Sequence, residues 1–207
     1  MNDIEFELNE GWISCWALLK LAPPADAFAQ LIATYSDDNR AYHDISHLHH
    51  VITLYREFQE HFVLPGEAGI ALFYHDAIYD PKRSDNEPRS ADMAEAVMVQ
   101  AGAGHAAIAA VRTFIMATCH DAVPEDPDAK LVVDIDLSVL GSSDETYQRY
   151  VQDVRNEYSH VPGFLFKRGR RKVMESFLKR ESIYQTPLFR ERFEAKAREN
   201  IRRELDS

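Results

Sequence analysis

The sequence contains only two cysteines, Cys15 and Cys119, among its 207 residues. Two cysteines without a C-x-x-C spacing form neither a disulfide framework nor a zinc ribbon, so we predict two reduced, buried thiols. Glycine (8 residues) and proline (9 residues) are also scarce, which excludes a collagen-like or low-complexity chain. A chain of this length can build its core without cross-links. We therefore predict a globular protein with a single domain over 1–207.

Long apolar runs and excess positive charge are absent as well. No run approaches the roughly 20 residues of a membrane-spanning helix, and the acidic start MNDIEFELNEGW lacks the features of a signal peptide. We expect a cytoplasmic protein without membrane contacts. The 23 Lys and Arg against 34 Asp and Glu give a formal charge of −11. This charge argues against nucleic acid as the partner and is compatible with a small phosphorylated molecule in a local pocket. A homodimer is among the oligomeric states that the sequence leaves open.

Strand-like alternation is almost absent from the chain. The β-branched run LVVDID (131–136) is too isolated to found a sheet, whereas apolar residues recur at helical spacing, for example at Leu48, Val51 and Tyr55. Glycine and proline separate the periodic segments. The pattern predicts an all-α, single-domain multi-helix bundle. We expect helices at 8–21, 25–36, 46–61, 66–79, 87–101, 104–119, 130–140, 144–160, 163–180 and 188–205.

Histidine is the unusual component, with six of nine residues inside 43–75. His43 and His47 have the i,i+4 spacing that places two side chains on one helix face. The apolar residues Val51 and Tyr55 continue the His47 side, so His47 is predicted to point into the core. A lone histidine on an apolar face is more often a hydrogen-bonded core residue than a metal ligand, so the remaining candidates decide between these interpretations.

Two further segments carry polar residues within apolar sequence. His75 and Asp76 interrupt ALFYHDAIYDP (71–81), and Asp134 and Asp136 interrupt KLVVDIDLSVLG (130–141). A buried carboxylate costs several kcal/mol, on the order of 1–5, unless a cation or strong donors compensate it. Imidazole and carboxylate together suit a divalent Mn, Fe, Co, Ni or Zn ion. Each piece alone has an ordinary explanation, such as an aspartate at a helix N-cap, but the ordered set favours a metal site.

The order of His, then His-Asp, then Asp on a helical chain resembles the HD superfamily of metal-dependent phosphohydrolases. YHDISH also looks like the YHNxxH segment of cyclic-nucleotide phosphodiesterases, with Asp44 in place of the asparagine. More closely, the chain resembles a bacterial family of small predicted HD-type phosphohydrolases over roughly residues 8–205. The segments that carry this resemblance are RAYHDISH, FYHDAIYDP, NEPRSA, ATCH, VDIDLSVLG, RNEYSHV and AREN.

The resemblance implies a fold and a function. It implies an HD-domain-like bundle that binds a divalent metal ion (Mn, Fe, Co, Ni, Zn or Mg) and hydrolyses a nucleotide or another small phosphate ester, with a metal-bound water as nucleophile. The implied metal ligands are His47, His75, Asp76 and Asp134, with Asp136 as the alternative to Asp134. His43 corresponds to the proton donor for the leaving group.

Three other residues are candidates for the reaction. Arg40 is predicted to neutralise charge on the phosphate. Glu87 is predicted to orient the attacking water or a ligand histidine, with a capping role at a helix start as the alternative. His120 is predicted to contact phosphate or a second metal ion, or else to be a histidine favoured at a helix C-terminus.

Two other functions stay open, and one further segment is notable. The chain could be a non-catalytic metal- or nucleotide-binding module, or a di-iron oxygenase on an HD-like scaffold. The basic cluster FKRGRRK (166–172) is most simply a solvated helix start, and its functional alternative is contact with phosphate or nucleic acid.

Overall fold

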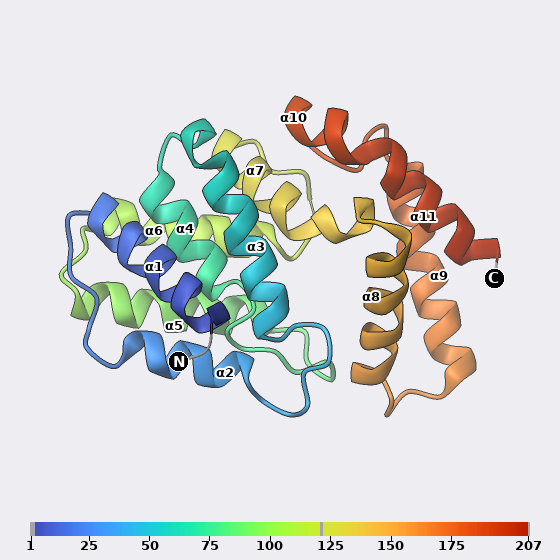
Figure 1. Ribbon diagram of the computed structural model, residues 1–207, viewed down its shortest axis with the longest axis horizontal. Coiled ribbons are helices and arrows are strands. Elements are labelled where there is room, and N and C mark those ends of the chain that lie inside the picture. Colours follow the sequence, from blue (N-terminus) through green and yellow to red (C-terminus); the bar gives the residue numbers. More distant parts are fainter. Residues whose placement is uncertain (1–2, 121, 207) are drawn as a thin grey trace. The chain divides into compact units, whose positions relative to one another are not determined.

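All regular elements of the protein are helical, as the computed structural model shows for residues 3–120 and 122–206 (Figure 1). This confirms the all-α prediction. The chain divides into two compact units, Met1–Ile135 and Asp136–Ser207. The single domain over 1–207 stays a prediction, because a compact unit within a chain is not by itself a domain that folds alone. Within the described ranges, no helix has both the length and the apolar character needed to cross a bilayer.

The first unit is built around helix α4. Its residues from Ala68 to Tyr74 are all buried, and α4 packs against α1, α3, α5 and α6 (Figure 1). A helix that is apolar on every side is stable only in such a central position. The elements of this unit are α1 (Asp3–Leu18), α2 (Ala27–Tyr35), α3 (Ile45–Phe58), the 3₁₀ turn η1 (Gln59–His61), α4 (Pro65–Tyr74), α5 (Asn86–Gln100), α6 (His105–Ala117) and α7 (Pro127–Asp136).

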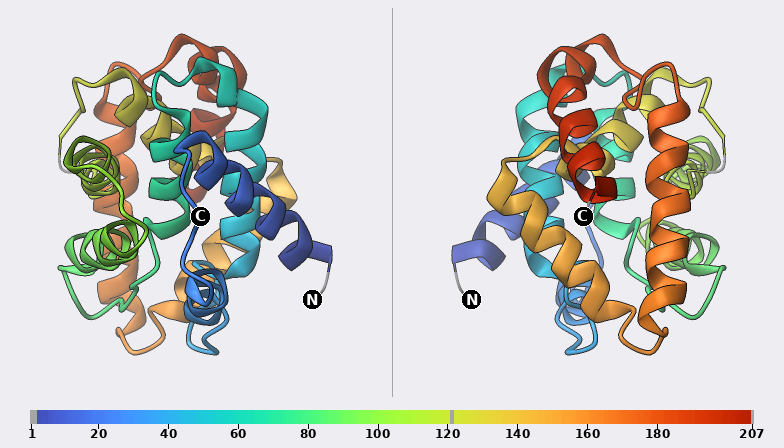
Figure 2. Two further views of the ribbon diagram at one scale, coloured as in Figure 1. Left: turned by 90° about the vertical axis from the view of Figure 1, so that its left-hand side faces the viewer. Right: turned by 90° about the vertical axis from the view of Figure 1, so that its right-hand side faces the viewer.

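The second unit begins where α7 ends. Helix α11 packs against η2 and α9, and Figure 2 shows these elements from two further sides. Asn200, in the AREN segment, donates from Nδ2 to the carbonyls of Leu140 and Ser142 at 2.9 Å each, which ties α11 to the end of η2. The elements are η2 (Leu137–Gly141), α8 (Asp144–Glu157), α9 (Gly163–Lys179), α10 (Pro187–Phe189), the π-helical segment η3 (Arg190–Glu194) and α11 (Ala195–Asp206).

The two cysteines differ in their surroundings. Cys15 is completely buried in α1, and burial raises the pKa of its thiol to about 12, which keeps the thiol protonated and unreactive. Cys119 is only half-buried, so the prediction of two buried thiols was wrong for this residue. Neither cysteine forms a disulfide.

Gly69 allows α4 to approach its neighbours closely. A Cβ atom at this position would lie 2.8 Å from the Tyr55 ring and would also collide with the Cys15 sulfur. We expect Gly69→Ala to lower the free energy of unfolding by about 1–3 kcal/mol, measured by urea denaturation. Gly169→Ala is the control, because nothing lies within 4 Å of its Cβ position in the middle of α9. That change should raise stability by about 0.5–1 kcal/mol, and equal losses in both variants would contradict the packing argument.

Candidate metal centre

Asp44 positions His47 at the start of α3. The Asp44 backbone is extended, and its carboxylate accepts hydrogen bonds from the amides of Ser46 (2.8 Å) and His47 (3.2 Å). Aspartate and asparagine are equally good N-cap residues. The cap fixes the backbone of the buried His47.

The His75–Asp76 pair follows α4 directly. The predicted helix 66–79 is shorter in the structure and ends at Tyr74, so Asp76 lies in a turn. Adjacent side chains on a helix diverge by about 100°. Because the helix stops before this pair, the turn lets both side chains reach the same point. His75 itself is 1 % exposed.

Three ligand atoms converge beside this turn. His47 Nε2 and His75 Nε2 are 3.1 Å apart, and Asp76 Oδ2 lies 3.1 Å from His75 Nε2 and 3.5 Å from His47 Nε2. Atoms bound to one ion at about 2.1 Å are separated by about 3.0 Å in an octahedral site and about 3.4 Å in a tetrahedral site. The three separations match those of ligands around a single metal ion.

Leu72 determines which nitrogen of His75 faces the cluster. His75 Nδ1 lies 2.8 Å from the Leu72 carbonyl oxygen, an acceptor, so Nδ1 carries a proton. In the neutral ring the lone pair is then on Nε2, facing an imidazole nitrogen and a carboxylate oxygen. Such a group of electron-rich atoms is stable only with a cation among them, either a proton or a metal ion. The donor set therefore fits a divalent metal.

The charge state of Asp76 agrees with this arrangement. Burial alone raises the pKa of this carboxyl, but with a proton as the cation in the cluster, the charged His75 and His43 rings and the hydrogen bonds from His47 and His75 outweigh it. The resulting pKa lies well below the ordinary value, so Asp76 is a carboxylate, the form that binds metals.

Asp136, not Asp134, completes the cluster. The ligand atoms of His47, His75, Asp76 and Asp136 all lie within 4.8 Å of one another, and we call these four residues the His–Asp cluster. This corrects the preferred assignment of Asp134 and favours its alternative. Residues two apart on a helix point about 200° apart, so only one of the two aspartates can face the cluster. Asp134 is completely buried elsewhere along α7.

Asp128 explains how α7 brings Asp136 to this place. Its buried carboxylate accepts hydrogen bonds from the amides of Val63 (2.9 Å) and Leu64 (2.7 Å) at the start of α4. At about 1.5 Å per residue, Asp136 lies about 12 Å further along α7. The His75–Asp76 pair lies about 17 Å along α4 from the same level. The Asp128 contact therefore joins the start of α7 to the start of α4, and the cluster residues lie at the other ends of these two helices.

His43 lies beside the His–Asp cluster and outside it. Its ring stacks on Tyr79 with 4.1 Å between centroids, and its centroid is 5.6 Å from that of His47. His43 also contributes to the low pKa of Asp76, which places it within electrostatic reach of the cluster. This position, next to the ligands but not among them, is the one that a proton donor requires.

Arg40 binds backbone carbonyls beside the cluster. Its guanidinium donates hydrogen bonds to the carbonyls of His43 (3.0 Å), Asp76 (2.7 Å) and Ala77 (2.9 Å). It also lies over the rings of Tyr35 and Tyr79. Through these three hydrogen bonds the Arg40 side chain holds the loop of His43 against the His75–Asp76 turn. We call this arrangement the clamp. These contacts give Arg40 a positioning role, and the predicted contact with phosphate stays a prediction.

The clamp gives a testable expectation. Lysine cannot supply the planar set of donors that holds three carbonyls. We expect Arg40→Lys to weaken metal binding about 10-fold, as is usual for a support of a metal ligand, with little change in helix content. Mn²⁺ titration followed by calorimetry measures this. Arg83→Lys is the control, because Arg83 is exposed and its ion pair is with Asp85, outside the cluster; equal weakening in both would argue against the clamp.

Glu87 and His120 lie outside the His–Asp cluster. Glu87 is half-buried in the first turn of α5, where a negative charge favours the helix. The capping alternative describes this place better than the orientation of a water. His120 follows α6 with a left-handed backbone (φ 57°), which is strained for a residue with a side chain. The structure does not bring either residue into the group of four.

Sequence reasoning missed two residues of the NEPRSA segment that brace the loop after Asp76. Asn86 is buried and pairs with the Asp80 backbone, accepting from its amide at 3.1 Å and donating to its carbonyl at 3.0 Å. The Ser90 hydroxyl bonds the amide (3.0 Å) and the carbonyl (3.3 Å) of Ile78. The signal in the sequence was the spacing of these two polar residues. Asn86 and Ser90 are four apart, so they lie on one face of α5, and both are buried.

Comparisons with known proteins identify no relatives. No protein-family model matches the sequence, and neither the curated proteins nor the solved structures contain a significant match. What the structure establishes is a group of two buried histidines and two half-buried aspartates that could hold a metal ion.

Proposed function

We propose that this protein is a divalent-metal-dependent phosphohydrolase that acts on a nucleotide or another small phosphate ester. The observation that carries the proposal is the convergence of His47, His75 and Asp76 at 3.1–3.5 Å, with Asp136 completing the set. Two neutral imidazoles and two carboxylates suit Mn, Fe, Co, Ni or Zn, with Mg as a weaker candidate. The resemblance to HD-type phosphohydrolases in the sequence supports the choice of reaction.

The residues of the chain have separate tasks in this reaction. A bound divalent ion supplies a water of lowered pKa and a positive contact for a phosphoryl oxygen. His75 keeps its proton on Nδ1 against Leu72 and presents Nε2 to the cluster. His43, held against Tyr79, donates a ring proton to the leaving oxygen. Arg40 holds the backbone that carries His43 and Asp76.

Metal content of two aspartate variants tests the ligand set. We expect the wild-type protein, purified without chelator or histidine tag, to contain about one transition-metal ion per chain. Asp136→Asn should lower the affinity for the metal ion by about 10-fold or more, because a neutral amide replaces a carboxylate ligand. Asp134→Asn is the matched control on the same helix and should keep its metal. Loss in the Asp134 variant alone would reverse the assignment.

A hydrolysis screen tests the reaction. Nucleotides and bis-p-nitrophenyl phosphate, assayed with Mn²⁺, Co²⁺ or Ni²⁺, should give metal-dependent release of phosphate or nitrophenol. Bound metal without turnover of any phosphate ester would favour the non-catalytic binding module. Two iron ions per chain with an oxygen-dependent product would favour the di-iron oxygenase.

A further inference from the structure

The second unit carries a charge opposite to that of the first. Residues 136–207 contain 15 Lys and Arg against 12 Asp and Glu, a net charge of +3, whereas residues 1–135 contain 8 against 22, a net charge of −14. The positive charge is concentrated on α9, where the FKRGRRK cluster lies. A cationic region in a protein of net charge −11 points to an anionic ligand.

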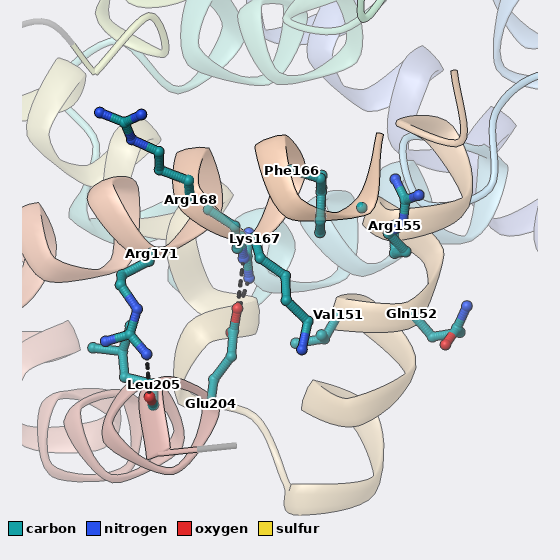
Figure 3. A pocket seen from close by; sticks show the side chains of 11 residues that line it. Val151, Gln152, Arg155, Phe166, Lys167, Arg168, Arg171, Glu204 and Leu205 are labelled. Atoms are coloured by element: carbon teal, nitrogen blue, oxygen red, sulfur yellow. Dashed lines mark hydrogen bonds and ion pairs between the residues drawn. The ribbon is translucent and has the colours of Figure 1, made fainter. Parts of the chain in front are cut away.

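A cavity lies beside this cluster, within the second unit. It is bordered by α8, α9 and the end of α11 and has a volume of about 640 Å³ (Figure 3). Sites for small organic ligands usually occupy about 300–1,000 Å³. Five of its eleven lining residues are Lys or Arg and one is an acid, Glu204. The lining also contains the apolar side chains of Val151, Phe166 and Leu205.

The single acid of the lining is already neutralised. Arg170 pairs with Glu204 at 2.8 Å and also donates to the Tyr150 hydroxyl at 2.8 Å. These two partners raise the pKa of the Arg170 guanidinium despite its burial. Glu204 therefore offers no balance for the other cations of the lining. Arg171 has a separate partner, Glu175, at 3.6 Å.

Lys167 and Arg155 are the cations that a ligand can use. Figure 3 shows Lys167 extending from α9 into the space bordered by α8 and α11, whereas Arg168 extends away from it. Lys167 forms no ion pair with any described residue. Arg155 is held by the carbonyls of Tyr158 (2.6 Å) and Val161 (3.2 Å), with its guanidinium 4.8 Å from the Phe166 ring centroid. Carbonyls fix this side chain without cancelling its charge.

We propose that this cavity binds a small organic polyphosphate, of the nucleoside di- or triphosphate class. The phosphates match the charge of Lys167 and Arg155, since guanidinium and ammonium groups are the usual phosphate partners. Phe166 and Val151 contact the organic part. The site is made only of residues from the second unit, and it does not depend on the function proposed for the metal centre.

The test uses the full chain with an Asp76→Ala background in EDTA, which removes the metal centre as a competing nucleotide site. ATP binding is measured by isothermal calorimetry, with tripolyphosphate as a second probe. We expect Lys167→Glu to raise the ATP Kd about 10-fold, because it replaces an attractive charge by a repulsive one. Lys179→Glu makes the same charge change on the exposed end of α9, outside the lining, and should leave the Kd unchanged. Phe166→Leu should weaken ATP and spare tripolyphosphate.

Four outcomes would overturn the proposal. The first is the absence of ATP binding in the Asp76→Ala protein when the wild-type protein binds it, which would assign the nucleotide to the metal centre. The second is no ATP binding to either protein. The third is equal weakening by the Lys167 and Lys179 variants, which would leave only a diffuse charge effect. The fourth is sedimentation with phosphatidic acid vesicles without any ATP binding, which would assign the phosphate group to a lipid surface.

Discussion

Asp76→Ala should abolish both metal binding and phosphoester hydrolysis. Asp76 Oδ2 lies within 3.5 Å of both imidazole nitrogens, and its charge is the one that balances a cation between them. Removing it leaves two neutral histidines and Asp136. We expect metal content to fall from about one ion per chain to background and turnover to fall about 10³-fold or more. Elemental analysis and an assay with bis-p-nitrophenyl phosphate measure the two effects.

A thermal measurement separates the loss of metal from a failure to fold. A ligand present at 100 times its Kd stabilises the folded state by about 2.7 kcal/mol. Added Mn²⁺ should therefore raise the Tm of the wild-type protein and leave that of Asp76→Ala unchanged. Asp85→Asn is the control, because Asp85 is an exposed partner of Arg83 and lies outside the cluster. If Mn²⁺ raised the Tm of Asp76→Ala as much as that of the wild-type protein, the metal would bind somewhere other than the His–Asp cluster.

The helices were predictable because their periodic segments are long and end at turn residues. Strong 3.6-residue periodicity and an apolar α4 require little knowledge of tertiary contacts. The exact end of α4 was not predictable. The predicted helix continued to residue 79, whereas the helix stops at Tyr74 and the carbonyls of Asp76 and Ala77 bond to Arg40, which is more than 30 residues away in the chain.

Three of the four residues of the His–Asp cluster were predictable from the sequence. His47, His75 and Asp76 stand out as polar residues in apolar surroundings, and the structure brings them together. The choice between Asp134 and Asp136 depends on the rotation of α7 about its axis. That rotation follows from contacts such as the one between Asp128 and the start of α4, which no local pattern reveals. The contacts of Arg40 with backbone carbonyls were not predicted, because the residue type alone does not show whether its donors meet phosphate or the backbone.

His43→Ala should separate metal binding from catalysis. His43 lies beside the His–Asp cluster without belonging to it, so the variant should keep about one metal ion per chain. Loss of a proton donor typically lowers kcat about 10²–10⁴-fold. The loss should be large for an alkyl phosphate, whose leaving oxygen needs a proton, and small for p-nitrophenyl phosphate, whose leaving group departs as a stable anion.

This dependence on the leaving group distinguishes a proton donor from a structural residue. A histidine that only stacked on Tyr79 to hold the loop would, when removed, slow both substrates to a similar extent. His49→Ala is the matched control, because His49 lies on the same helix as His47 and pairs with Glu7 at 2.8 Å. Its variant should retain normal kcat with both substrates. If His43→Ala slowed the two substrates equally, His43 would be a positioning residue, and the proton for the leaving oxygen would come from another group.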